Sequence, residues 1–290
     1  MSGGEGPRGR VMLSAVWLLL VCVAGGVAAE TDTSFVPERD GPLFEARKEG
    51  TVEAVAQALA AGANINAASP SHGQTTLFNA IVFQQADIVD FLLDEGADPH
   101  VKQKMGFSAL DGACFSGNGV AVPKLLALGL DPTLVSEEDG NAPLVRAAWG
   151  GSPGHAEALA AIFAARPDVD AATVFSAKSG LPLYSEAAKN AETQRVVANQ
   201  ILRTHCPDVG ARADGAVDVH VERYDYDADA ATTTFDITVV SEDGAVDTCA
   251  KTLATPNPNK DKPYAPKTPP PKVSVSVNRG EDDEAAKDEL

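Results

Sequence analysis

Cysteine, aromatic and basic residues are all scarce in this chain of 290 residues. Four cysteines are too few for a scaffold built on disulfides, and an aromatic content of 6% argues against a large β-sandwich or a lectin-like face. Only 23 Lys and Arg stand against 41 Asp and Glu, and the net charge of −18 disfavours nucleic-acid binding because phosphates repel such a surface. Apolar residues still make up 44% of the chain, enough for a buried core in one or two domains.

Long apolar runs are also missing, except near the start of the chain. Arg8 and Arg10 precede an unbroken apolar run from Ala15 to Ala24, and small residues continue to Ala29. This order is typical of a secretory signal peptide, so we expect residues 1–29 to be cleaved off. A membrane anchor is the alternative, but the run is shorter than the ~20 residues that a spanning helix needs. No membrane span is expected after cleavage, which leaves 21 basic and 40 acidic residues, a net charge of −19.

The last four residues are Lys287, Asp288, Glu289 and Leu290. They match the K-D-E-L signal by which a retrieval receptor returns proteins to the endoplasmic reticulum. Together with the signal peptide, they predict a soluble protein of the oxidising endoplasmic-reticulum lumen, with the retrieval receptor as one partner. The chain has no N-x-[ST] sequon, so no N-linked glycan is expected to cover any face.

The sequence between residues 41 and 208 repeats with a period of about 33 residues. Five leucines recur at intervals of 34, 33, 34 and 39 residues: Leu43, Leu77, Leu110, Leu144 and Leu183. An apolar pair follows each leucine, after fifteen residues in the first three units and eighteen in the last two: Ala58-Leu59, Leu92-Leu93, Leu125-Leu126, Ile162-Phe163 and Ile201-Leu202. The last two units therefore carry the same three-residue insertion.

Each unit is predicted to form two short helices and an extended finger. A Thr, Ser or Pro just before the leucine suits a helix N-terminus, where a hydroxyl caps free N–H groups and proline fits the first turn. Gly62, Gly96 and Gly129 follow the second helix, where a left-handed residue ends it. One helix pair cannot bury its own apolar stripe, so neighbouring units must stack.

This order of T-P-L-H, A-A, G, L-L and G-A-D resembles the ankyrin-repeat family, most closely in units two and three. The resemblance covers residues 41–208 and implies a mainly α solenoid of about five repeats. Unit one has Ala58 in place of a leucine, and units four and five end in Arg-Pro-Asp and Cys-Pro-Asp in place of Gly-Ala-Asp. No unit keeps the family's histidine after the leucine.

The chain on either side of residues 41–208 has a different pattern. Residues 30–40 are predicted to be a linker. In residues 209–254 apolar and polar residues alternate around Val219 and Ile237, and Asp243-Gly244 suits a hairpin, which predicts a small three-stranded β meander capping the array. Residues 255–290 are rich in proline, then acidic, and are predicted to be a disordered tail that holds the K-D-E-L signal clear of the fold. The spacing of Pro263, Pro266 and Pro269 also suits a ligand for a proline-binding domain.

The sequence contains little that indicates catalysis. We find no G-x-S-x-G, H-E-x-x-H, C-x-x-C or phosphate-binding glycine motif, and we expect no cofactor. The histidines are scattered singly and are interpreted as polar residues of fingers, loops or strands, whereas Cys114 is interpreted as a buried thiol. Four acidic residues copy positions 1, 3, 5 and 12 of a calcium loop, but an acidic turn between strands is the favoured interpretation: Asp225, Asp227, Asp229 and Asp236.

Cys206 and Cys249 are the natural disulfide pair. Cys22 leaves with the signal peptide and Cys114 lies in the middle of a predicted helix, whereas the lumen favours oxidation of the remaining two. Two unpaired thiols are the alternative. The bond would join the meander to the last repeat.

The resemblance also implies a binding face, because the last residues of each inner helix look onto the concave groove of ankyrin proteins. Alignment of the units places Phe83, Phe115 and Trp149 there, and predicts an apolar stripe across adjacent repeats; burial of these rings in the core is the alternative. The neighbouring positions and finger residues predicted to line the same groove are Lys48, Glu49, Val82, Ser116, Gly150, Ser71, His72, Gln74 and Phe107.

Two functions remain open at this point. The first is a non-catalytic scaffold or adaptor that binds a lumenal protein through the groove. The second is a folding factor or enzyme that uses the repeats as a substrate platform, with weak calcium binding in the C-terminal segment. Loss of all binding on deletion of residues 209–254, with the array still folded, would favour the second. The missing motifs favour the first.

Overall fold

The computed structural model describes residues 30–213 and 218–257, and the chain divides into two units after Asp32. All the elements below belong to the unit that begins at Thr33. The predicted signal peptide, the retrieval signal and the tail beyond Asn257 lie outside the described residues.

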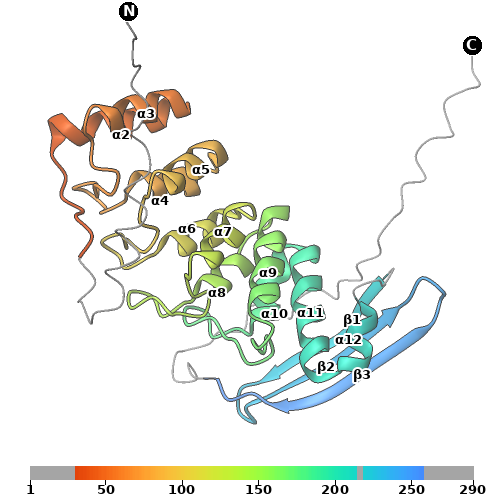
Figure 1. Cartoon of the computed structure of the whole chain (residues 1–290). Coiled ribbons are helices and arrows are strands. Elements are labelled where there is room, and N and C mark those ends of the chain that lie inside the picture. The colour runs from red at the N-terminus through yellow and green to blue at the C-terminus, as the bar shows by residue number, and fades with distance from the viewer. Residues whose placement is uncertain (1–29, 214–217, 258–290) are drawn as a thin grey trace, which may run out of the picture. The chain divides into compact units, whose positions relative to one another are not determined.

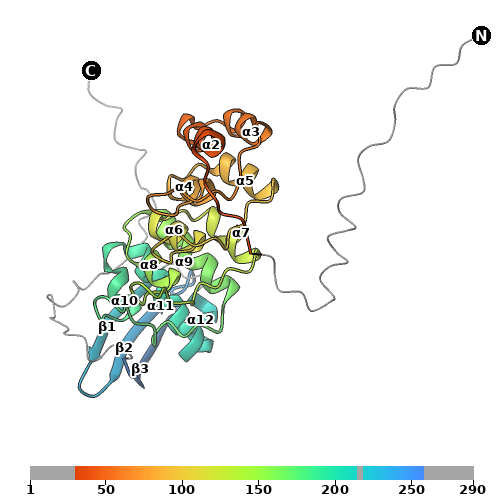
Figure 2. The same ribbon diagram turned by 90° about the vertical axis from the view of Figure 1, so that its left-hand side faces the viewer.

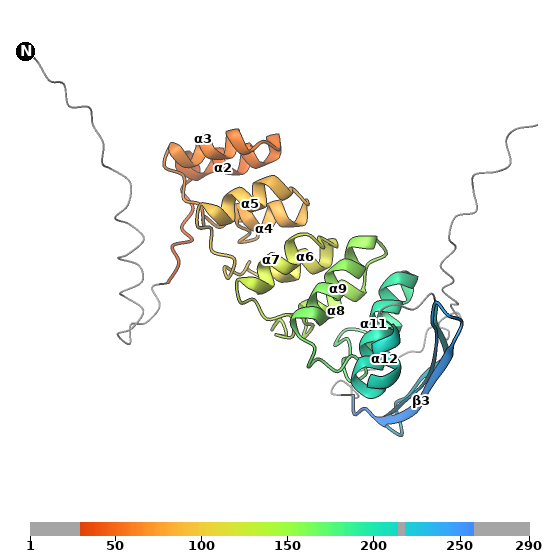
Figure 3. The same ribbon diagram turned by 45° about the vertical axis from the view of Figure 1, so that its right-hand side comes forward.

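Helices that alternate with fingers form five stacked layers (Figures 1 and 3). Each layer holds an inner and an outer helix, and the inner helices contact one another from layer to layer. The inner helices are α2 (Pro37–Glu49), α4 (Thr76–Val82), α6 (Ala109–Ser116), α8 (Pro143–Ala148) and α10 (Leu183–Glu186), the last continued by a 3-10 turn (Ala187–Lys189). The outer helices are α3 (Val52–Ala60), α5 (Ala86–Asp94), α7 (Ala121–Ala127), α9 (Pro153–Ala165) and α11 (Ala191–His205).

The repeated leucines form the centre of the core, because each lies where an inner helix meets its neighbours. Leu43, Leu77, Leu110, Leu144 and Leu183 are each exposed by 2% or less. The outer helices contribute Leu92, Leu125, Ile162 and Ile201, all fully buried. Gly62, Gly96 and Gly129 have φ between 88° and 97°, so the predicted left-handed ends of α3, α5 and α7 are confirmed.

The hydroxyl caps form as the sequence predicts in units two and three. Thr75 accepts a bond from the N–H of Phe78 (3.1 Å), and Ser108 and Asp111 form a reciprocal capping box at the start of α6. Unit one differs, because Pro42 lies inside α2, which begins at Pro37 within the predicted linker. The carboxylate of Asp40 makes this earlier start possible, since it accepts bonds from the N–H groups of Val36 (2.7 Å) and Asn64 (2.8 Å). Hydrogen bonding from Arg39 outweighs burial and lowers the pKa of Asp40 to about 2.

His155 links units three and four. The sequence interpretation placed the histidines in fingers, loops or strands, but His155 lies in helix α9 and is 7% exposed. Its Nδ1 is 2.6 Å from Oγ of Ser152, and its Nε2 is 3.2 Å from the carbonyl oxygen of Phe115. These two bonds fix the imidazole against the backbone of Gly117 and Gly150, where there is no room for a side chain.

Gly150→Ala is therefore expected to lower the free energy of unfolding by about 1–3 kcal/mol, as overpacking does in other cores. A Cβ atom on Gly150 would lie 1.8 Å from Nε2 of His155, which its hydrogen bonds hold in place. Gly151→Ala is the matched control, because its Cβ would meet no atom closer than 3.8 Å. Urea unfolding of both variants tests the expectation, and equal losses at 150 and 151 would contradict it.

A three-stranded antiparallel sheet covers the last repeat, as the predicted meander does. The strands are β1 (Asp218–Asp227), β2 (Thr232–Val240) and β3 (Val246–Ala254), in that order across the sheet. Phe235, Ile237 and Val239 of β2 are fully buried and face the helices, since α12 (Pro207–Ala213) contacts β2 and β3. Helix α12 was not expected from the sequence, which placed Pro207 and Asp208 at the end of the array and residues 209–213 in the meander.

The alternation of β1 is interrupted by a bulge. The register against β2 shifts between Val221 and Arg223. Val219 faces the core before the shift, and Tyr224 takes that role after it, stacked on Tyr184 of α10 with 4.4 Å between ring centres. The bulge thus turns an aromatic side chain onto the last repeat.

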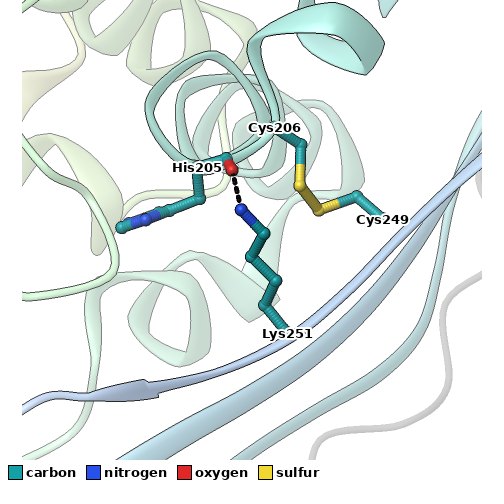
Figure 4. Close-up of a disulfide and its surroundings, with 4 residues drawn as sticks. All are labelled: His205, Cys206, Cys249 and Lys251. Carbon is teal, nitrogen blue, oxygen red and sulfur yellow. Dashed lines mark hydrogen bonds between the residues drawn. A yellow bond between two sulfur atoms is a disulfide. The ribbon is translucent and has the colours of Figure 1, made fainter.

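The predicted disulfide is present between Cys206, at the end of α11, and Cys249 of β3, with a Cα–Cα distance of 6.3 Å (Figure 4). Lys251 reinforces the same junction, because its Nζ donates to the carbonyl oxygen of His205 (Figure 4). One covalent bond and one charged hydrogen bond therefore hold β3 against the last long helix.

Candidate partner-binding groove

The C-terminal ends of the inner helices lie along one side of the stack. Figure 2 shows α4, α6 and α8 one below another, each with the outer helix of its own repeat (α5, α7 or α9) beside it. Val82 is the last residue of α4 and Phe83 follows it, whereas Phe115 and Ser116 end α6. Together with the fingers, these helix ends form the surface that we call the groove.

Two of the three predicted aromatic side chains are exposed on the groove. Phe83 is 63% and Phe115 is 62% exposed, on successive repeats. The guanidinium of Arg47 lies 4.8 Å from the centre of the Phe83 ring, which supports one face of that ring. The exposed stripe therefore runs across repeats two and three.

Trp149 departs from the predicted stripe. It follows α8 as expected, but its side chain is only partly exposed and packs against the hydrophobic core. The guanidinium of Arg146 lies 5.6 Å from the indole ring and occupies part of the space in front of it. The alternative of a ring folded back onto the core thus describes Trp149 better than Phe83 or Phe115.

A pocket of about 240 Å³ opens beside Phe115. Helices α4, α6 and α8 and two fingers contribute its lining: Gln74, Phe78, Val82, Gln103, Phe107, Asp111, Gly112, Phe115 and Arg146. Four of these residues, Gln74, Val82, Phe107 and Phe115, were predicted to line the groove. Gly112 keeps α4 and α6 close, since a Cβ there would lie 3.1 Å from the Phe78 ring.

Arg146 is the main charged group of the pocket, and the sequence analysis missed it. It is 4% exposed, and its Nε donates to Asp111 (2.9 Å) while its second guanidinium nitrogen, Nη2, donates to Asp139 (2.8 Å). Burial would raise the pKa of Asp139, but the bonds from Arg146 and Asn141 outweigh it, so the pKa lies below its usual value. The guanidinium also covers the Phe107 ring at 4.3 Å. The pocket thus has an aromatic lining, and the charge of Arg146 beside it is balanced by Asp111 and Asp139.

A signal for Arg146 does exist in the alignment of the repeats. Arg146 occupies the position that Gly112 holds in unit three and Asn79 in unit two. Because unit three has Gly112 at that position, the long side chain of Arg146 has room to reach Asp111 of unit three. A comparison of charged residues between adjacent units would have found the Arg146–Asp111 pair, whereas a comparison of equivalent positions in the aligned repeats does not show it.

The remaining predicted groove residues lie at its margins. Lys48 and Glu49 end α2 and are exposed, with Lys48 paired to Glu45 at 2.7 Å. His72 and Ser71 are exposed on the finger of unit two, 3.0 Å apart between Nδ1 and Oγ, and do not line the pocket. The backbone of this finger is tied to the next one, because the N–H of Lys104 donates to the carbonyl oxygen of His72.

The structure does not gather the acidic residues that copied a calcium loop. Asp225 and Asp227 lie on β1, Asp229 lies in the turn, and Asp236 lies on β2 opposite Arg223. In residues 30–213 and 218–257, no group of three or more His, Cys, Asp or Glu side chains could hold a metal ion. Cys114 is fully buried in α6, and this burial raises the pKa of its thiol.

Comparisons with known proteins identify the repeats. The family model "Ankyrin repeats (3 copies)" matches residues 10–103. The chain contains ankyrin repeats. It is 40% identical over 82 residues to the 2-5A-dependent ribonuclease of Mus musculus, a match of 28% of this chain and 11% of that protein. It is 36% identical over 102 residues to the inactive serine/threonine-protein kinase TEX14 of Bos taurus, 35% of this chain and 7% of that protein.

This chain spans about a tenth of the length of these relatives or less, so each likeness covers only a small part of the relative. Ankyrin repeats in general serve as non-catalytic scaffolds that bind proteins, and the name of the kinase relative marks it as inactive. Among the described helices, none is both long enough and apolar enough to cross a membrane.

Proposed function

We propose that this protein is a non-catalytic scaffold or adaptor of the endoplasmic-reticulum lumen that holds a partner protein through the groove. The observation that carries the proposal is the pair of rings Phe83 and Phe115, more than 60% exposed on successive repeats beside a pocket. Exposed aromatic side chains next to a pocket are typical of the centre of a protein interface.

The composition of the groove supports a protein partner over a small polar ligand. The rings of Phe78, Phe107 and Phe115 line the pocket, and its one buried cation is already paired with Asp111. Gln74 and Gln103 add amide groups on the finger side, where they can pair with a peptide backbone. Apolar walls with a few neutral hydrogen-bonding groups suit an extended peptide with an apolar side chain as anchor.

The double variant Phe83→Asp and Phe115→Asp is expected to abolish partner capture from the lumen, because it places two charges in the centre of the interface. Both side chains are exposed, so the free energy of unfolding should change little. Leu128→Asp is the matched control, since Leu128 is also exposed, at 46%, but follows the outer helix α7. Affinity purification after crosslinking measures capture, and equal capture by the double variant and the wild type would contradict the proposal.

The lumenal location rests on the two terminal sequences and has its own test. Deletion of Lys287 to Leu290 is expected to send the protein into the medium, because the retrieval receptor reads these residues at the C-terminus. Immunoblots of cells and medium measure the distribution. Continued retention of the shortened chain would show that another interaction holds the protein.

A further inference from the structure

We propose that residues 258–272 of this same chain occupy the groove and place Tyr264 in the pocket beside Phe115. The inference rests on the proposed function only in taking the groove as a peptide-binding surface. The chain would then carry its own competitor for the partner.

The point at which the described chain ends is fixed close to the fingers. After β3, Thr255 is fully buried, with its Oγ1 2.7 Å from Oγ1 of Thr233. Asn257 is 9% exposed, and its Nδ2 donates to the carbonyl oxygen of Gly180 (3.0 Å) in the finger of unit five. The following residues therefore start from the finger side of the stack.

A short path of contacts leads from this point to the pocket. In the same finger as Gly180, the N–H of Ala177 donates to Oδ1 of Asn141 (2.8 Å) in the finger of unit four. Asp139, two residues before Asn141, holds Arg146, which lines the pocket. Packed helices lie 8–10 Å apart, so two repeat steps separate Asn257 from the pocket by about 20 Å.

The length of the tail matches this path. Tyr264 lies seven residues after Asn257, and seven residues at about 3.1–3.3 Å each reach roughly 22 Å. Tyr264 is also the one aromatic residue in positions 258–290. Its side chain offers a ring to Phe107 and Phe115 and a hydroxyl to Gln74 or Gln103.

Charge favours the same pairing. Residues 30–257 hold 15 basic and 33 acidic residues, a net charge of −18, whereas residues 258–272 hold four lysines and one aspartate, a net charge of +3. Glu137 and Glu138 are exposed in the finger of unit four, the same finger that contributes Asp139 and Asn141 to the contacts described above. Lys260 and Lys262 would pass these carboxylates before Tyr264 reaches the pocket.

The composition of the segment also suits aromatic walls. Six of residues 258–272 are prolines, and proline-rich segments bind grooves lined by aromatic side chains because little conformational entropy is lost on binding. The groove offers Phe83, Phe107 and Phe115 in this role. The groove thus serves as the binding site for the proline-rich segment noted in the sequence.

Photo-crosslinking tests where the segment lies. The photoreactive residue p-benzoylphenylalanine is placed at position 264 of the chain 30–290, and mass spectrometry locates the crosslinks. We expect crosslinks to residues 74–83 and 103–116 of the same chain, and none to the groove from the control position Val277. Mixing heavy and light isotope-labelled chains separates the cases: crosslinks between chains, or none in the groove, would overturn the proposal.

Peptide binding provides the second readout. A fluorescent synthetic peptide of residues 258–272 should bind the Tyr264→Ala chain about tenfold more tightly than the wild type, because the attached tail competes at millimolar effective concentration. Adding Phe115→Ala should remove this binding. Equal affinity for the two chains, or binding to neither, would refute occupation by the tail. Loss of partner capture in the Phe83 and Phe115 variant would still stand in that case, so the two proposals fail separately.

Discussion

Replacement of Arg146 by alanine is expected to lower the free energy of unfolding by about 3–5 kcal/mol, the usual cost of breaking a buried ion pair from one side. Arg146 is 4% exposed and Asp111 is 6% exposed, so loss of the guanidinium leaves a buried carboxylate without its cation. Denaturant unfolding followed by circular dichroism measures the loss. Because the pair joins repeats three and four, the transition should also broaden as the two halves of the array become less coupled.

Two further variants make this expectation specific. Arg166→Ala is the matched control, since Arg166 makes comparable bonds to Asp131 and Asp168 but lies on the surface, and its loss should leave the unfolding midpoint unchanged. Addition of Asp111→Asn to Arg146→Ala should recover part of the loss, because it removes the uncompensated charge. If Arg146→Ala were no more damaging than Arg166→Ala, the ion pair would not stabilise the array.

Loss of the disulfide is expected to cost a similar amount. The bond between Cys206 and Cys249 spans 43 residues, and the chain-entropy relation gives about 4 kcal/mol for a loop of this length. Cys249→Ser should therefore lower the melting temperature by several degrees, with the sheet opening before the repeats. Reductant should lower the melting temperature of the wild type to that of the variant and leave the melting temperature of the variant unchanged.

Peptide mapping supplies the control for this result. Under native, non-reducing conditions, alkylating reagents should modify neither Cys206 nor Cys249, whereas both should react after reduction. Cys114 is fully buried and should react only after unfolding. Alkylation of Cys206 and Cys249 in the native protein would show that the bond does not form.

The array could be predicted from the sequence because its signals are local and repeated. Each unit carries the leucine, the cap and the glycine that it needs, so an alignment of five short segments was enough to place Leu110 in the core and Gly96 at a helix end. The disulfide followed from elimination among four cysteines. These features depend on residues within one unit or on simple counting.

The features that the sequence did not predict depend on contacts between units. The position of Trp149 on its helix suggested exposure, but the neighbouring guanidinium of Arg146 and the core decide where the ring lies. Pro42 suggested a helix start, but Asp40 and the finger residue Asn64 extend α2 back to Pro37. His155 was interpreted as a polar residue of a finger, loop or strand, but it lies in α9 with its ring against Gly117 and Gly150 of two adjacent units. Periodicity within one repeat contains no information on such contacts.

Because the sheet covers only one end of the stack, we expect local unfolding to begin at the other end. Helix α11 contacts α9 of the preceding layer and is also covered by α12 and β1, whereas the pair α2 and α3 contacts only α4 and α5 as its main neighbours among the described elements. The stability of a stacked array is a sum over nearest-neighbour interfaces, so the layer with one interface exchanges its amide hydrogens first. Unfolding then proceeds from α2 toward the disulfide. The layers that carry Phe83 and Phe115 unfold before the layers next to the sheet. A protease or an unfolding chaperone would therefore dismantle the groove while the opposite end of the fold was still intact.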